Sequence, residues 1–214
     1  MTDLKSTAGV TADEVLAYVA ENYVSIEHLA AQTQVAADRI LGLIAAECVP
    51  PHAYDITGEI VISSAFGTYR QPMTPRRVYP PSLSAWIRRA EPLAREIGLN
   101  DAARQIRAEF LASFAEALPD RWPGGPEDAW ALLRDGSWGL CLKEIAPENA
   151  ITKERARVAV AAHRASGPDD PAPLQAEIAI YDAVTLPFAP HERPESSRAR
   201  EIDPFRPASA NARC

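Results

Sequence analysis

The chain has 214 residues, of which 47% are hydrophobic and 24% are charged, and its formal net charge is −7. These values are typical of a globular protein, and no apolar run approaches the roughly 18 residues that a membrane-spanning helix requires. Three widely separated cysteines (Cys48, Cys141, Cys214) favour reduced thiols over a disulfide framework, and four scattered histidines show no zinc-site spacing. The N-terminus lacks the features of a signal peptide. We therefore expect a cytoplasmic protein with no metal site and no membrane partner.

Charge is distributed unevenly along the chain. Residues 6–69 contain eight carboxylates and a single base, Arg39, whereas residues 70–107 contain eight arginines against three acidic residues. An acidic segment followed by a basic one predicts docking within the chain, a polar partner, or an anionic ligand in the basic segment. The alternative is a mixed, solvated surface that has no binding role.

Capping signals mark the N-terminal helices. Thr11 followed by Glu14 is a capping-box pattern ahead of a first helix, and Ser25 can cap a second. A third helix is expected after residue 34, ending at Pro50-Pro51. The β-branched run from Ile56 to Ile62 predicts a short hairpin.

The remainder of the chain predicts helices and then a tail. Residues 66–82 contain four prolines and predict an irregular arm. Apolar residues recur at helical spacing over 83–118, with a break at Gly98, and again over 147–166 and 174–186. We therefore expect a mainly α protein in three parts: a helix-turn-helix with a hairpin wing over 11–66, a helical bundle over 83–186, and an extended Pro/Arg-rich tail over 187–214.

The stretch from Tyr23 to Pro51 resembles the helix-turn-helix of MerR-type regulators, in its aromatic entry, Ser25-Ile26-Glu27, Leu29-Ala30, Val35, Ile40 and Val49-Pro50-Pro51. The resemblance implies a recognition helix in the major groove, flanked by basic anchors. DNA-binding proteins commonly make about 6–10 phosphate contacts through Lys and Arg. One arginine among eight carboxylates repels a polyanion, so we expect this surface not to bind nucleic acid. A MerR-like DNA-binding regulator is the alternative.

The run DGSWGLCLKEIAPENAITKE, residues 135–154, places a thiol beside a glycine-rich turn. If the segment is extended, Cys141 shares a face with Lys143, whose charge favours a thiolate. Cys141 is therefore a candidate nucleophile. Cysteine is also among the residues most often buried for packing alone, which is the competing interpretation.

Glu154 is the second candidate catalytic residue. Helical spacing over 147–166 puts it in an apolar stripe with Ile151 and Val158, and puts His163 nearly opposite. A lone buried carboxylate is costly, so Glu154 must be paired or protonated. It is either a general base or half of a buried ion pair between helices, with Arg157 or a more distant arginine as its partner.

The C-terminal tail interleaves arginines with serines. Arg193, Ser197, Arg198 and Arg200 can bind a carboxylate or phosphate through guanidinium contacts, and we regard them as a candidate anion or ligand site. The same residues can instead clamp the tail onto the acidic N-terminal part.

Three segments, taken in order, resemble a small family of bacterial proteins described as natural-product biosynthesis proteins. They are FGTYR with Tyr79 and Trp86, then SWGLCLKEIAPENAITKE, then LPFAPHERPESSRAR. The family pattern is matched by Trp138-Gly139, Cys141, Pro147-Glu148, Lys153-Glu154 and Ser197–Arg200, with Ser137 as a departure. The resemblance implies a role in secondary metabolism and transfers no catalytic assignment.

The sequence thus predicts an accessory protein or small enzyme of a bacterial natural-product pathway, acting on a small-molecule substrate or with a partner protein. A scaffold that docks a partner enzyme through the acidic N-terminal face is a further alternative. The sequence identifies no cofactor.

Overall fold

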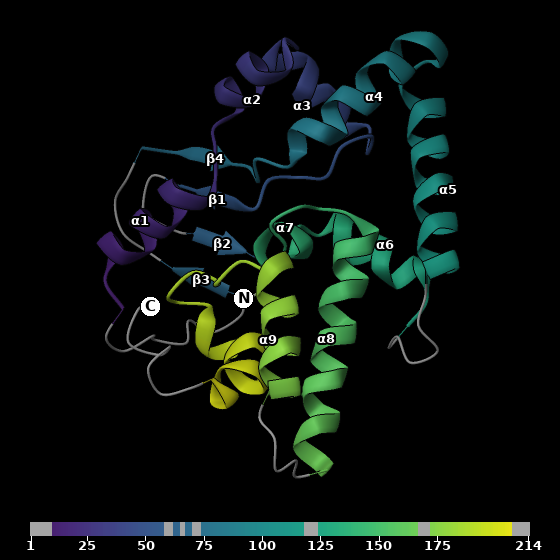
Figure 1. Cartoon of the computed structure of the whole chain (residues 1–214). Helices are drawn as coiled ribbons and strands as arrows, with labels where there is room; N and C mark the ends of the chain where they lie inside the picture. Colours follow the sequence, from purple (N-terminus) through teal and green to yellow (C-terminus); the bar gives the residue numbers. More distant parts are fainter. Residues whose placement is uncertain are drawn as a thin grey trace.

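Helices make up most of the computed structural model, which describes residues 10–57, 62–64, 67–69, 74–117, 124–166 and 172–206 (Figure 1). The mainly α prediction is therefore confirmed. A small antiparallel sheet lies between the N-terminal helices and the C-terminal helices (Figure 1).

The N-terminal helices begin where the capping signals predict. Helix α1 (Ala12–Asn22) has Thr11 as its cap, and the Thr11 hydroxyl and the Glu14 carboxylate each accept a hydrogen bond from the other residue's backbone N–H. Ser25 caps α2 (Ile26–Thr33), and α3 (Ala37–Ala45) follows after three residues. Two short helices separated by a tight turn are thus present, while their MerR-like character stays a prediction.

Four short strands form one sheet in the order β3-β2-β1-β4. Strands β1 (Tyr54–Ile56) and β2 (Ile62–Ser64) pair in antiparallel fashion, as the predicted hairpin requires, although its turn over 58–61 lies outside the described residues. The arm predicted as irregular over 66–82 is wrong in part, because it contains β3 (Gly67–Tyr69) and β4 (Arg76–Val78). The prolines flank β4, which lies at the sheet edge, so none interrupts the ladder.

The middle of the chain is helical, as predicted. Helix α4 (Leu83–Ile97) ends at Gly98, whose φ of 85° lies in the left-handed region that favours glycine, and α5 (Leu99–Ala117) starts directly after it. The remaining helices are α6 (Pro126–Arg134), the single-turn α7 (Ser137–Cys141), α8 (Pro147–Ser166) and α9 (Ala172–Val184).

The predicted extended tail is wrong over 193–205. These residues form three short helical turns, η1 (Arg193–Glu195), η2 (Arg198–Ile202) and η3 (Asp203–Phe205), packed beside α9 (Figure 1). Ile202 is fully buried against α8 and α9, and Asp182 of α9 accepts hydrogen bonds from Arg198 (2.7 Å) and Arg206 (2.6 Å). These contacts compensate for the chain entropy that is lost when the tail becomes ordered. Residues 207–214 lie outside the described part.

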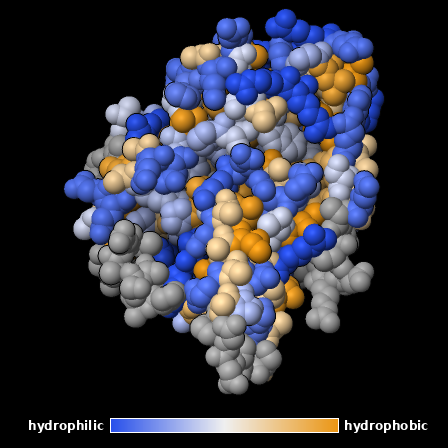
Figure 2. All heavy atoms as spheres, viewed as in Figure 1, coloured by the Kyte–Doolittle hydropathy of each residue, from blue (hydrophilic) through white to orange (hydrophobic). Residues whose placement is uncertain are grey.

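The largest core cluster joins the N-terminal and helical regions. It includes Leu29 and Ile40 from the predicted 11–66 part together with Phe110 and Trp138 from the predicted 83–186 part. On the surface, hydrophobic residues gather along α9, where Ile180 is 44% exposed (Figure 2). Within the described residues no helix is both long and apolar enough to cross a membrane.

Candidate functional site

Two glycines shape the turn that precedes Cys141. Gly136 has a φ of 86°, and a Cβ there would lie 3.2 Å from the carbonyl oxygen of His52. A Cβ on Gly139 would lie 3.0 Å from Pro80 Cγ, so only glycine allows the sheet region to approach α7 this closely. The turn therefore joins the N-terminal region to the segment that carries the thiol.

Cys141 lies in the interior, with 5% of its surface exposed. Its backbone carbonyl accepts a hydrogen bond from Leu186 N–H (3.1 Å), and Lys143 N–H donates to Val184 O (3.0 Å). The chain after α7 is thus fixed against the end of α9. Cys141 ends a short helix rather than lying in an extended segment, so it does not pair with Lys143, whose ammonium is exposed and donates to Asp182 O (2.7 Å).

The cation beside Cys141 is Lys153 of α8. Lys153 is half-buried, and its ammonium interacts with the Cys141 thiol and the Tyr181 phenol. Burial acts to lower the pKa of Lys153, but the interactions with Cys141 and Tyr181, and then with Glu154, outweigh burial and raise it. Within the described parts of the chain, Lys153 has no carboxylate at ion-pair distance. An interior ammonium without such a partner is rare, because desolvation alone costs several kcal/mol.

Two tyrosine hydroxyls point into the same region without a hydrogen-bond partner among the described residues. They belong to Tyr18 of α1, which is 8% exposed, and to Tyr181 of α9, which is fully buried. Burial raises the pKa of both phenols, and both respond to the charges of Cys141 and Arg198. Each phenol nevertheless has a hydroxyl neighbour that acts to lower its pKa, which is Tyr23 for Tyr18 and Ser197 for Tyr181.

A buried carboxyl group forms the other end of this region. Glu192 is 2% exposed and accepts hydrogen bonds from the Tyr54 hydroxyl (2.8 Å) and the Ser64 hydroxyl. Burial raises the pKa of Glu192, and no described Arg or Lys lies at ion-pair distance from it. His191 Nε2 lies 3.7 Å from the Glu192 carboxylate, and burial lowers the pKa of His191 to about 4.

Tyr18 and Tyr23 connect the two ends. Tyr18 senses the charges of both Glu192 and Cys141, and the Tyr23 hydroxyl donates to Gly139 O (3.1 Å) while its ring meets Tyr54 edge-on at 4.9 Å. We refer to the whole set as the buried polar cluster. Its members are Tyr18, Tyr23, Tyr54, Cys141, Lys153, Tyr181 and Glu192.

Glu154, the predicted partner of Cys141, is held elsewhere. Its carboxylate accepts two hydrogen bonds from Arg157, one of them 2.9 Å long from Nε, and Arg157 in turn contacts Glu201 of η2 at 2.5 Å. Glu154 is thus ion-paired within α8, with Arg157 as the sequence offered, and Arg157 extends the network to η2 through Glu201. The predicted stripe was also misplaced, since Val158 is only half-buried and the buried face of α8 consists of Ala150, Ile151, Ala156 and Val160.

The predicted anion-binding residues of the tail divide into two groups. Arg193 pairs with Asp203 (3.0 Å), and Arg198 donates to Asp182 (2.7 Å) and Thr185 (3.1 Å), so these two guanidinium groups hold the C-terminal turns in place. Ser197 lies beside Tyr181, where a hydrogen bond acts to lower the pKa of that phenol, and Arg200 is exposed. The clamp interpretation thus describes Arg193 and Arg198, although they clamp α9 and the turns themselves rather than the N-terminal part.

Sequence reasoning missed Lys153, Glu192 and the tyrosines as site residues. A signal for Lys153 was available, since it follows Ala150 by three residues and precedes Val160 by seven, which places it on their buried face. No local pattern marks Glu192, because its partners Tyr54 and Ser64 lie more than a hundred residues away.

The only base of the acidic N-terminal segment is not available to a polyanion. Arg39 of α3 pairs with Glu91 of α4 at 2.6 Å, and Arg95 holds the second oxygen of that carboxylate at 2.5 Å. Burial alone would raise the pKa of Glu91, but hydrogen bonds from Arg39 and Arg95 outweigh it and lower the pKa. The expectation that this surface does not bind nucleic acid stays a prediction.

Comparison with known proteins adds a family. Residues 98–209, more than half of the chain, match the sequence model described as "Family of unknown function (DUF6058)". The chain belongs to this family. No curated protein and no solved structure matches it. The family segment contains Cys141, Lys153, Tyr181 and Glu192, whereas Tyr18, Tyr23 and Tyr54 come from the region before it.

Proposed function

We propose that the chain is a small cytosolic enzyme of a bacterial natural-product pathway, with Cys141 as its nucleophile and Lys153 as the counter-ion of the thiolate. The observation that carries the proposal is the inward-facing ammonium of Lys153, which lies beside Cys141 without a carboxylate at ion-pair distance in the described residues. Loss of the Cys141 thiol proton to water would give the ammonium a neighbouring anion, since a nearby cation favours a thiolate.

The resemblance to natural-product biosynthesis proteins supports the same site. Cys141, Lys153 and Ser197 come from three of the motifs that carry the resemblance, and they converge around Tyr181. The tight turn before the cysteine also has a structural reason, because Gly136 and Gly139 let the chain around His52 and Pro80 approach α7 closely.

The chemistry that this arrangement allows is attack on an electrophilic carbon, such as the carbonyl carbon of an acyl group. The Cys141 sulfur forms the new bond, and the leaving group departs with the bonding electrons and takes a proton from the Lys153 ammonium. Water or an acceptor then attacks the same carbon and gives its proton to the Lys153 amine, and Cys141 departs as the thiolate, which restores the starting state. The unpaired hydroxyls of Tyr18 and Tyr181 can donate to the oxygen on which negative charge develops.

The test is the rate at which iodoacetamide alkylates Cys141 in the folded protein, followed by mass spectrometry of the Cys141 peptide. Lys153→Met should slow alkylation about tenfold or more, because each 1.4 kcal/mol of lost charge stabilisation is a factor of ten. Lys143→Met is the matched control, since Lys143 is nearer in sequence but donates to Asp182 O, and its rate should equal that of the unmodified chain.

Cys141 is buried to the same degree in the parent chain and in both variants, so a difference in alkylation rate does not come from the access of iodoacetamide to the thiol. Thermal unfolding should show Lys153→Met to be as stable as the parent chain or more stable, because methionine needs no counter-ion. Equal alkylation rates in the parent chain and in Lys153→Met would contradict the proposal and leave Cys141 as a packing residue.

A further inference from the structure

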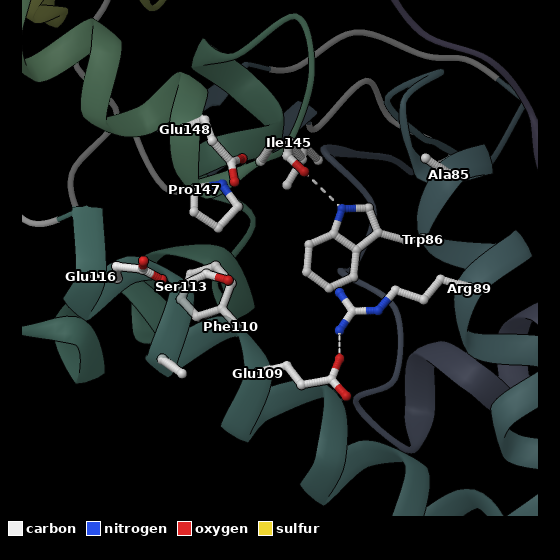
Figure 3. A pocket seen from close by; sticks show the side chains of 12 residues that line it. Ala85, Trp86, Arg89, Glu109, Phe110, Ser113, Glu116, Ile145, Pro147 and Glu148 are labelled. Atoms are coloured by element: carbon white, nitrogen blue, oxygen red, sulfur yellow. Dashed lines mark hydrogen bonds and ion pairs between the residues drawn. The ribbon is translucent and has the colours of Figure 1, made fainter.

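A groove of about 580 Å³ lies between α4, α5 and the start of α8, apart from the buried polar cluster (Figure 3). This volume is within the range of small-molecule sites. Trp86 and Phe110 contribute aromatic surface, and Arg89, Glu109, Glu116 and Glu148 contribute charge.

The aromatic residues of the groove are held in place by their neighbours. The Trp86 indole N–H donates to Ile145 O at 2.8 Å, as Figure 3 shows. Phe110 packs edge-on against Trp130, with ring centroids 5.1 Å apart, and against Trp138 at 5.5 Å. Both side chains are more than nine-tenths buried, so the apolar floor exists before any ligand arrives.

The charges around the floor do not balance. Arg89 is neutralised by an ion pair with Glu109, drawn as a dashed line in Figure 3. Glu116 and Glu148 form no ion pair with any residue in the described ranges, and both are exposed. The groove therefore keeps two uncompensated negative charges beside aromatic surface.

The two carboxylates lie at opposite ends of their helices. Glu148 is in the first turn of α8, where the helix dipole stabilises an anion. Glu116 is in the last turn of α5, where the dipole is unfavourable to an anion, and that turn contains no basic residue. Helix electrostatics thus favour the charge of Glu148 but not that of Glu116, which has no cation at ion-pair distance among the described residues.

We propose that the groove binds an organic cation, an ammonium group carried on an aromatic or aliphatic body. The ammonium would lie at the carboxylates of Glu116 and Glu148, and the body would rest on Trp86 and Phe110, whose ring faces also attract cations. The charge complementarity excludes an anionic ligand of the same shape. This site is independent of the proposed role of Cys141.

The test is a calorimetric titration of the full chain with 2-phenylethylammonium, against 2-phenylethanol and 3-phenylpropionate as neutral and anionic ligands of similar body. The amine should bind with a Kd of about 1 mM or tighter, and this affinity should fall as the salt concentration is raised. The alcohol and the carboxylate should each bind at least about tenfold more weakly than the amine.

Variants then locate the bound amine. Glu116→Gln and Glu148→Gln should each weaken binding about three- to fivefold, whereas Glu96→Gln, at an exposed position of α4 that does not line the groove, should leave it unchanged. Ala112→Phe places a large side chain in the groove from an exposed position and should abolish binding without unfolding the protein. Equal affinity for amine and alcohol, or binding that survives Ala112→Phe, would overturn the proposal.

Discussion

Glu91 and Glu192 are two carboxylates buried to nearly the same degree, at 5% and 2% exposure, in opposite surroundings. Glu91, at the contact between α3 and α4, has an arginine on each oxygen, and its pKa is lowered. Glu192, in the buried polar cluster, has two hydroxyl donors, the backbone of Ala189 and a neutral imidazole nearby, and burial raises its pKa.

The difference in counter-charge distinguishes Glu91, which stabilises the fold, from Glu192, whose burial costs stability. The fold gives Glu91 all the counter-charge that it needs, so its burial is explained by the contact that it makes. Glu192 and Lys153 are instead buried without such partners, which a chain selected for stability alone would replace by apolar residues. Perturbed groups of this kind are frequent at functional sites; here Lys153 lies beside Cys141, and Glu192 lies at the other end of the buried polar cluster.

The largest effect is expected from Glu91→Gln, which removes the charge shared by Arg39 and Arg95. Charge-assisted hydrogen bonds contribute about 1.5–3 kcal/mol, so the free energy of unfolding should fall by about that amount at pH 7. Urea unfolding followed by circular dichroism measures it. Glu96→Gln on the same helix is the control and should change stability by less than about 0.5 kcal/mol, because Glu96 is exposed. Equal effects of the two changes would remove the distinction drawn for Glu91.

An intermediate effect, of opposite sign at the two sites, is expected when the pH is varied. The lowered pKa of Glu91 means that its contribution is complete above the ordinary value of 4.5 and is lost as the pH falls through the folded-state value. The stability difference between the parent chain and Glu91→Gln should therefore close in acid.

The raised pKa of Glu192 reverses this dependence. Between 4.5 and the folded-state value, the unfolded carboxyl ionises while the folded one stays protonated, so stability is lost as the pH rises. Glu192→Gln should match the parent chain in acid and become the more stable protein as the pH rises. Unfolding curves measured between about pH 4 and pH 8 distinguish the two sites, and parallel pH profiles for the two variants would contradict the assignment.

The smallest effect at neutral pH is expected from Glu192→Gln itself. The amide keeps the shape and accepts from Tyr54 or Ser64 without a charge to desolvate, so the free energy of unfolding at pH 7 should be unchanged or higher by up to about 1 kcal/mol. A loss comparable to that of Glu91→Gln would show that Glu192 is a stabilising residue after all.

Local chemistry could be predicted from the sequence wherever its causes lie within a few residues. Thr11 and Glu14 cap α1 as expected, Gly98 separates two helices, and Arg157 pairs with Glu154 three residues away. The tail was predicted incorrectly because its order comes from Asp182, which lies outside the tail.

The candidate site could be predicted only in part. Cys141 and Ser197 were identified from their motifs. Glu154 was chosen over their common neighbour Lys153, because an acidic residue in an apolar stripe is more conspicuous in the sequence than a lysine next to that stripe. Glu192 could not be found in this way, since its two hydroxyl donors come from strands of a sheet that precedes the family segment.

The hydrogen bonds from Tyr23 to Gly139 and from Tyr54 to Glu192 have a consequence for how the family is delimited. The sequence shared with the family starts at residue 98, yet the walls that keep water from its most unusual side chains are built by residues that precede it. The family segment is therefore smaller than the part of the chain that packs together as one fold. A chain cut at residue 98 would leave the Cys141 thiol and its neighbours open to solvent.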